Sequence, residues 1–235
     1  QTFSQTLACL TESPQLKKFR VVSDNSNMGS LSINSITPLL RQQGLEELVI
    51  DVYGLQQESY QEPGNHLLHK LIDAIASMEP RSLRTLVCPC RQTPASQPYR
   101  NHYYHQNNQA AYPPITSLLY IAKTTPELTK LSIALDSSAR PDRETLKSLL
   151  DTWDYHTPGG NLLYLEIIEM RETAFGWREC GELARLLDAV FPRLVSITMA
   201  NVLNRPTTWD EAWEVVEENR KLYQELRLRR SVQWT

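Results

Sequence analysis

The sequence predicts an α/β fold in which short parallel strands alternate with helices in one curved, repeating stack. Two observations support this. A short apolar pattern, Leu-x-x-Leu-x-Leu with apolar substitutions, occurs six times along the 235 residues. A segment with helical periodicity precedes each copy, and a proline or glycine stands close before its first leucine in most of them. The order helix, breaker, strand favours consecutive strands that run parallel.

The positions within each copy have predictable directions. We expect the first, fourth and sixth residues to face the core, as Leu128, Leu131 and Ile133 do in the fourth copy, and the third and fifth residues to face outward from the strands. The copies begin at Leu16, Leu45, Leu83, Leu128, Leu162 and Leu194, and the breakers before them are Pro14, Gly44, Pro80, Pro126, Gly160 and Pro192.

Several helices are predicted between the copies. Residues 65–78 begin at Asn65 as N-cap and place an apolar face on one side: Leu67, Leu68, Leu71, Ile72 and Ile75. Residues 115–124, 142–153 and 179–191 have the same periodicity. Because one strand-helix unit cannot bury both of its faces alone, stacked neighbours are expected to share a continuous core.

These six stretches resemble leucine-rich repeats, in the irregular form found after the F-box in fungal F-box proteins. The spacings between first leucines are 29, 38, 45, 34 and 32 residues, longer than the roughly 20–29 residues of regular repeats. The ninth position lacks the usual Asn or Cys, and the residues there are Asp24, Tyr53, Arg91, Asp136, Met170 and Val202. The resemblance implies an irregular leucine-rich-repeat solenoid with helices on its convex side.

The same resemblance implies a non-catalytic role in protein binding. The chain would be the substrate-recognition region of an F-box-type ubiquitin-ligase adaptor, with the F-box either upstream of Gln1 or lost. An upstream F-box would join it to a Skp-type adaptor. A scaffold or complex subunit without a link to ubiquitin is an alternative with the same fold. A third alternative is an α/β enzyme with a doubly wound sheet.

Two regions are predicted. Residues 1–204 form the solenoid, with an insertion loop at 91–114, and residues 205–235 form a C-terminal capping helix and tail. Thr208 and Glu211 have capping-box spacing at the start of this helix. Its predicted inward face carries Trp209, Trp213 and Val216, followed by Leu222, Tyr223 and Leu226. A partner-binding helix with exposed aromatic residues is the alternative.

The candidate binding residues are on the strand face and in the insertion loop. A face whose chemistry varies along the strands suits a protein or peptide ligand on the concave side. Ala134 and Ile168 also fall at outward positions, and Tyr112 extends the tyrosine cluster of the loop. The candidates are Lys18, Arg20, Glu47, Val49, Asp51, Lys130, Ser132, Tyr164 and Glu166 on the face, and Tyr99, Tyr103 and Tyr104 in the loop.

One cluster resembles a metal site. Cys88, Cys90, His102 and His105 lie close in sequence, but Cys-x-Cys spacing differs from the Cys-x(2–4)-Cys of structural zinc sites. Cys88 also occupies the sixth, inward position of the third copy. We therefore predict a core cysteine, no metal and no cofactor.

Other functions find little support in the sequence. It contains neither a Gly-x-Ser-x-Gly elbow nor a Gly-x-x-x-x-Gly-Lys loop. The acids of "IIEMRE" at 167–172 are interpreted as a solvated face. A net charge of -3 predicts no nucleic-acid ligand, and no apolar run approaches the about 18 residues of a membrane helix. Four cysteines favour a reducing compartment, cytoplasmic or nuclear.

Overall fold

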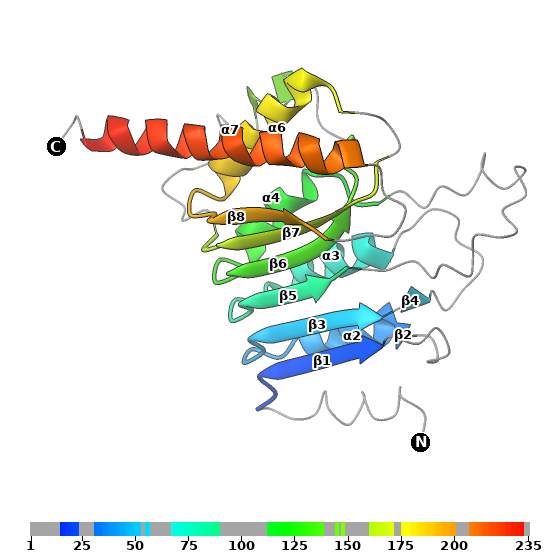
Figure 1. Ribbon diagram of the computed structural model, residues 1–235. Coiled ribbons are helices and arrows are strands. Elements are labelled where there is room, and N and C mark those ends of the chain that lie inside the picture. The colour runs from blue at the N-terminus through cyan, green and yellow to red at the C-terminus, as the bar shows by residue number, and fades with distance from the viewer. Residues whose placement is uncertain are drawn as a thin grey trace, which may run out of the picture.

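The computed structural model describes residues 15–23, 31–52, 55–56, 67–89, 112–138, 144–145, 147–148, 160–171, 175–200 and 207–232. Figure 1 shows a parallel sheet with helices packed behind it and a long C-terminal helix at one end. The strands are β1 (Lys18–Ser23), β2 (Leu31–Ser32), β3 (Glu47–Val52), β4 (Leu55–Gln56), β5 (Thr85–Cys88), β6 (Lys130–Leu135), β7 (Tyr164–Glu169) and β8 (Ser196–Met199). The helices are α2 (Ile33–Leu40), α3 (Leu67–Met78), α4 (Ser117–Thr124), α6 (Trp177–Val190) and α7 (Thr207–Val232).

The main sheet has six parallel strands in the order β1-β3-β5-β6-β7-β8. Each strand comes from one of the six apolar copies, and the order in space is the order in the sequence. β2 and β4 pair in a separate two-stranded sheet. A doubly wound sheet reverses its strand order at a switch point. The described sheet has no such reversal, so the doubly wound architecture considered as an alternative is wrong.

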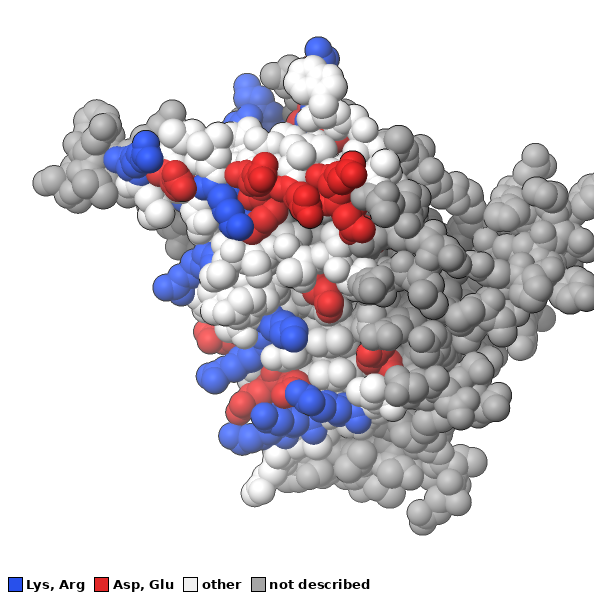
Figure 2. Space-filling view, viewed as in Figure 1, with Lys and Arg blue, Asp and Glu red and all other residues white. Residues whose placement is uncertain are grey.

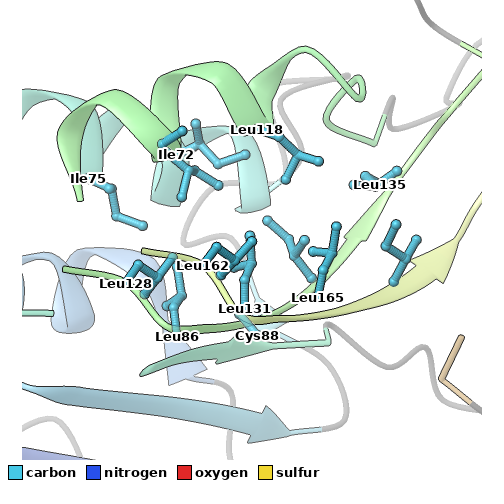
Figure 3. Packing of buried hydrophobic residues seen from close by; sticks show 14 of the residues in the cluster. Ile72, Ile75, Leu86, Cys88, Leu118, Leu128, Leu131, Leu135, Leu162 and Leu165 are labelled. Atoms are coloured by element: carbon cyan, nitrogen blue, oxygen red, sulfur yellow. The ribbon is translucent and has the colours of Figure 1, made fainter. Parts of the chain in front are cut away.

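The six copies lie in register. Their fourth residues form one buried row across the sheet, because each is the Cα partner of the next: Phe19, Leu48, Leu86, Leu131, Leu165 and Ile197. Cys88, the sixth residue of the third copy, is fully buried beside Ile133, as its position predicted. Figure 3 shows Leu86, Cys88, Leu131 and Leu165 pointing from the strands toward the helices, on the side where Ile72, Ile75 and Leu118 lie. The inward directions predicted from the pattern are confirmed.

A repeated pair of hydrogen bonds joins each copy to the next. The carbonyl of the second residue of one copy accepts hydrogen bonds from the N–H groups of the second and third residues of the following copy, at 2.7–3.2 Å. Glu46 and Glu47 donate to Lys17 in this way, and Thr129 and Lys130 donate to Arg84. The accepting residues in order are Lys17, Glu46, Arg84, Thr129 and Leu163. We call these the second-position carbonyls, and their regular bonding shows that the strands of the six copies begin at equivalent positions.

α7 closes the last copy with a side chain in place of a following unit. The second-position carbonyl of the sixth copy belongs to Val195, and it accepts a hydrogen bond from Nη2 of Arg220 at 3.4 Å. Nη1 of Arg220 donates to the neighbouring Leu194 carbonyl at 2.8 Å. Glu217 holds the guanidinium through two hydrogen bonds of 2.8 and 3.0 Å. Arg220 is fully buried, so the charged pair is shielded from water.

Two more side chains attach α7 to the turn between α6 and β8. Gln224 and Arg227 both donate to the Pro192 carbonyl, at 3.0 and 2.9 Å. Arg227 also forms an ion pair with Asp188 of α6, at 2.8 Å. Carbonyl groups at the end of α6 and in the following turn therefore find donors on α7.

The apolar contacts of α7 differ from those predicted. Trp213 and Val216 are buried as expected, whereas Leu222 and Leu226 are exposed. Since α7 begins at Thr207, Thr208 lies within the helix and does not precede it as an N-cap. The inward face of α7 turns away from Leu222 because Arg220, Gln224 and Arg227 contact the body there instead.

The end of the predicted insertion loop belongs to the packed structure. Tyr112 packs partly buried against the core, and the Pro113 carbonyl accepts a hydrogen bond from the Asp136 N–H at 2.9 Å. Pro114 forms a parallel bridge with Asp136. The boundary predicted at 114 is therefore late, and Tyr112 is not a free side chain of the loop. Residues 142–153, predicted as a helix, lie mostly outside the described residues.

Truncation of the core row tests the alignment of the copies. Leu131→Ala removes a fully buried side chain at the centre of the sheet, and we expect the free energy of unfolding to fall by about 2–5 kcal/mol. The matched control Leu228→Ala removes the same atoms from a side chain that is 59% exposed, with an expected change below about 0.5 kcal/mol. Urea unfolding followed by circular dichroism measures both, and equal losses would contradict the assignment of Leu131 to the core.

Removal of Arg220 tests the closure by α7. Arg220→Ala removes the buried partner of Glu217, which keeps only its ion pair with the exposed Lys221, and leaves the Leu194 and Val195 carbonyls without their donor. We expect a loss of about 3–5 kcal/mol in the free energy of unfolding. Arg81→Ala, which breaks the exposed ion pair with Glu79, is the control and should change stability by at most about 1 kcal/mol. If Arg220→Ala left the free energy of unfolding unchanged in the same urea titration, the assignment of α7 as the closure of the sheet would be contradicted.

Candidate functional site

The strand face of the main sheet gathers the predicted binding residues into rows. The strand register aligns the third residues of the six copies, and then their fifth residues, across the whole sheet. The first row is Lys18, Glu47, Thr85, Lys130, Tyr164 and Ser196, and the second row is Arg20, Val49, Val87, Ser132, Glu166 and Thr198. Asp51 follows in the next row, beside Val22. All nine residues predicted on the strands therefore lie on this one surface, which we call the strand face.

An ion-paired group occupies the β1 end of the strand face. Glu47 lies between Lys18 and Arg20, with Lys18 Nζ at 3.6 Å and Arg20 Nε in direct hydrogen-bond contact. The hydrogen bond from Arg20 and the two positive charges hold the pKa of the Glu47 carboxyl below its ordinary value. Only 8% of Glu47 is exposed, and since both cations are largely exposed, they and not the carboxylate are presented to a ligand.

Charges of both signs alternate along this end of the face. Lys17 forms an ion pair of 3.1 Å with Glu46, and its hydrogen bond lowers the pKa of that carboxyl. Arg84 and Lys130 add exposed cations further along the sheet. Figure 2 shows the resulting mixture of blue and red patches over the lower strands, separated by uncharged surface. Such an alternating field complements another protein surface better than it complements a polyanion.

The middle of the strand face carries an aromatic side chain and a shielded acid. Tyr164 is 50% exposed and is the register partner of the exposed Lys130. Ser132 is only 1% exposed, and its hydroxyl donates a 2.6 Å hydrogen bond to Oε2 of Glu166 on the adjacent strand. Ser132 therefore positions Glu166 and is not itself an accessible contact. Ser132, Ala134 and Ile168 were predicted as outward residues of the strand face, but all three are buried and are not accessible surface.

A buried polar cluster lies at the carboxyl end of β7. Oε1 of Glu169 accepts hydrogen bonds from the backbone N–H groups of Ser137, Met170 and Arg171, at 3.0–3.1 Å. Oε2 accepts a 3.0 Å hydrogen bond from Nε1 of Trp213 on α7. Burial raises the pKa of the Glu169 carboxyl, and this effect outweighs the hydrogen bonds that favour the ionised form. The carboxyl group joins β6, β7 and α7, so its role is to hold them together.

Arg171 completes this cluster. Its Nη1 donates to the Ser137 hydroxyl at 3.2 Å and its Nη2 pairs with Glu179 at 3.1 Å. Its guanidinium carbon lies 3.8 Å from the centroid of the Phe175 ring. The interpretation of the acids of "IIEMRE" as a solvated face is wrong for Glu169, which is 2% exposed, and the nearby Arg171 is equally buried. The alternation of side chains along the strand could have predicted that Glu169 is buried, because Leu165, Ile167 and Glu169 all point to the inward side.

The remaining candidates lie outside the described residues. These are Tyr99, Tyr103 and Tyr104 of the insertion loop, together with Cys90, His102 and His105 of the possible metal cluster. Cys88 is described, and it is a buried free thiol of the core. Over the described part of the chain, no three His, Cys, Asp or Glu side chains form a group that could hold a metal ion.

Comparisons with protein-family models, curated proteins and solved structures find no match to this chain. Among the helices of the described residues, none is both long enough and apolar enough to cross a bilayer.

Neutralisation of Glu47 tests the ion-paired group through its pH dependence. The pKa of Glu47 is lower in the folded chain than the ordinary 4.5, so its contribution to stability is present above 4.5. That contribution disappears as the pH falls through the folded-state pKa. We expect Glu47→Gln to cost up to about 1 kcal/mol at pH 7, because its partners are exposed, and to cost nothing in strong acid.

The measurement is urea unfolding of both chains across this range of pH. Glu218→Gln, a change at an exposed acid of α7, is the control. A cost for Glu47→Gln that stays constant from neutral to acid pH would contradict the ion-paired assignment.

Proposed function

We propose that this chain is a non-catalytic protein-interaction module that binds a protein or peptide on its strand face. The observation that carries the proposal is a six-strand parallel sheet with helices packed on one side and ordered rows of side chains on the other. A row that runs from Lys18 through Lys130 to Tyr164 spans five strands at fixed spacing. Rigid strands hold such side chains in place before binding. Binding a ligand therefore costs little conformational entropy of these side chains.

The chemistry of the strand face supports a protein ligand. Exposed cations alternate with paired acids, and the half-buried Val49 and Val87 lie on the same face as the half-exposed Tyr164, in the neighbouring row. A surface that combines an exposed tyrosine, apolar side chains and charges has a composition usual for protein-binding sites. A ligand with acidic side chains near Lys130 and an apolar group over Val87 would complement this surface.

The resemblance to the leucine-rich-repeat regions of fungal F-box proteins places the module, in this proposal, in a ubiquitin ligase. The chain would be an irregular leucine-rich-repeat solenoid that recognises the substrate, while an F-box elsewhere in the protein would bind a Skp-type adaptor. The sequential parallel strands and their equivalent hydrogen bonds support the solenoid part of this proposal. A scaffold subunit with no link to ubiquitin would use the same strand face.

Paired tyrosine variants test the strand face. A photoreactive amino acid at position 164 of the full-length protein identifies the ligand in cells, and the purified pair then gives a Kd. Tyr164→Ala should weaken that Kd about tenfold, because a central aromatic contact contributes on the order of 1–2 kcal/mol. Tyr120→Ala is the matched control, since Tyr120 is 61% exposed on α4, behind the sheet.

Lys130→Glu and Lys123→Glu form a second matched pair, with Lys123 on α4. Equal effects of the two members of each pair would contradict binding at the strand face. Recovery of a Skp-type adaptor with the full-length protein distinguishes the ubiquitin-ligase role from the scaffold role.

A further inference from the structure

α7 carries an apolar stripe that the rest of the described chain does not cover. Val215, Leu222 and Leu226 are 44%, 52% and 43% exposed, although each would contribute to stability if buried. Their spacing of seven and then four residues places them along one side of the helix. Asn219, half-buried, stands between Val215 and Leu222 on the same side. We call these four residues the α7 stripe.

The α7 stripe is distinct from the face that packs on the body. Trp213, Val216 and Arg220 are buried on that face. Trp213 donates to Glu169 of β7, and Arg220 donates to the Leu194 carbonyl before β8. At about 100° per residue, the centre of the stripe lies well over a quarter turn from the centre of that buried face. Figure 1 shows α7 at the margin of the molecule, with its C-terminal part extending beyond β8. The stripe is therefore open to another helix.

The charges of α7 are divided between its two halves. Residues 207–219 hold five acids and no base: Asp210, Glu211, Glu214, Glu217 and Glu218. Residues 220–232 hold five bases and one acid: Arg220, Lys221, Arg227, Arg229 and Arg230, with Glu225. Figure 2 shows this division as red along one part of the helix and blue along the other. A helix with such a division repels a parallel copy of itself and attracts an antiparallel copy.

We propose that two copies of this chain associate through their α7 stripes, with the two helices antiparallel. Pairing centred between Arg220 and Lys221 places Val215 of one copy opposite Leu226 of the other. The same register sets the turn with Glu211 beside the turn with Arg229. Because the pairing is two-fold symmetric, it forms both sets of contacts at once and closes the assembly at two chains.

The remaining residues of the stripe fit this arrangement. Asn219 comes opposite Leu222, and a single polar residue in an apolar helix seam is a known determinant of register. Arg229 is available, because its contact with Glu225 is long, at 3.7 Å, and both side chains are largely exposed. The helices are about 39 Å long, and one helix pair buries less area than a large permanent interface. The dimer is therefore expected to form reversibly in the micromolar range.

Sedimentation velocity across the micromolar range tests the dimer. The full chain should sediment as a monomer–dimer equilibrium whose dimer fraction falls as salt is added. Leu222→Glu should leave a monomer at every concentration, with unchanged helix content and thermal midpoint because Leu222 is exposed. Leu228→Glu is the matched control, since Leu228 is also exposed but lies outside the stripe. A monomeric wild-type chain, or a dimer that Leu222→Glu leaves intact, would overturn the proposal.

Charge reversal tests the antiparallel direction. Glu211→Arg alone and Arg229→Glu alone place like charges opposite each other in an antiparallel dimer, so each variant should dimerise at least several-fold more weakly than the wild type. Equimolar mixing of the two variants creates opposite charges at both sites of a mixed dimer, and it should restore association to about the wild-type level. In a parallel dimer each of these residues would lie opposite its own copy. A single reversal would then replace one pair of like charges with another pair of like charges and would not weaken association. Single variants as strong as the wild type, or mixtures that fail to associate, would overturn the antiparallel arrangement.

Discussion

The hydrogen bonds to the second-position carbonyls are the constraint on which the structure depends. Each such carbonyl accepts the N–H groups of two consecutive residues in the next copy, and this leaves one possible alignment between neighbouring strands. A shift by one residue would turn Leu48 or Leu131 toward solvent and expose the whole buried row. The backbone bonds and the apolar positions therefore require the same register, and each reinforces the other.

The last copy of such a stack needs hydrogen-bond partners from outside the copies. The sixth copy has no following strand, and its second-position carbonyl would lack a partner among the copies. α7 supplies the guanidinium of Arg220 at that place, held by Glu217, and Trp213 reaches the Glu169 carboxyl nearby. Buried charges are costly to desolvate, so they persist where they are paired and hydrogen-bonded. At this end of the sheet they bind backbone groups that an apolar side chain could not satisfy.

The alternation that builds the core also builds the strand face. Because successive strand residues point to opposite sides, the positions between the buried leucines are free to vary in chemistry. The register then places Lys130 beside Tyr164, and Glu47 between Lys18 and Arg20. The α7 stripe is a separate surface on another element, so the binding proposed at the strand face and the pairing proposed through α7 use different residues.

The six apolar copies determined the six strands, their parallel order and the inward direction of residues such as Leu131 and Cys88. Periodicity suffices for these features because they depend only on which residues leave water. The outward positions were also predictable, although only the tertiary structure decided which of them stay exposed: Tyr164 does, whereas Ser132 is covered. Residues 91–111, with three candidate tyrosines, lie outside this comparison.

What the sequence by itself determined about this protein is the repeating pattern of buried and outward positions, since that pattern is local. Only the tertiary structure decided the partners of Glu169, Arg171 and Arg220, which come from segments up to 44 residues away. It also decided which side of α7 is buried, because three polar side chains of the helix bond to backbone carbonyls of α6 and of the segment between α6 and β8. A pattern of hydrophobicity contains no information about such polar contacts between distant segments.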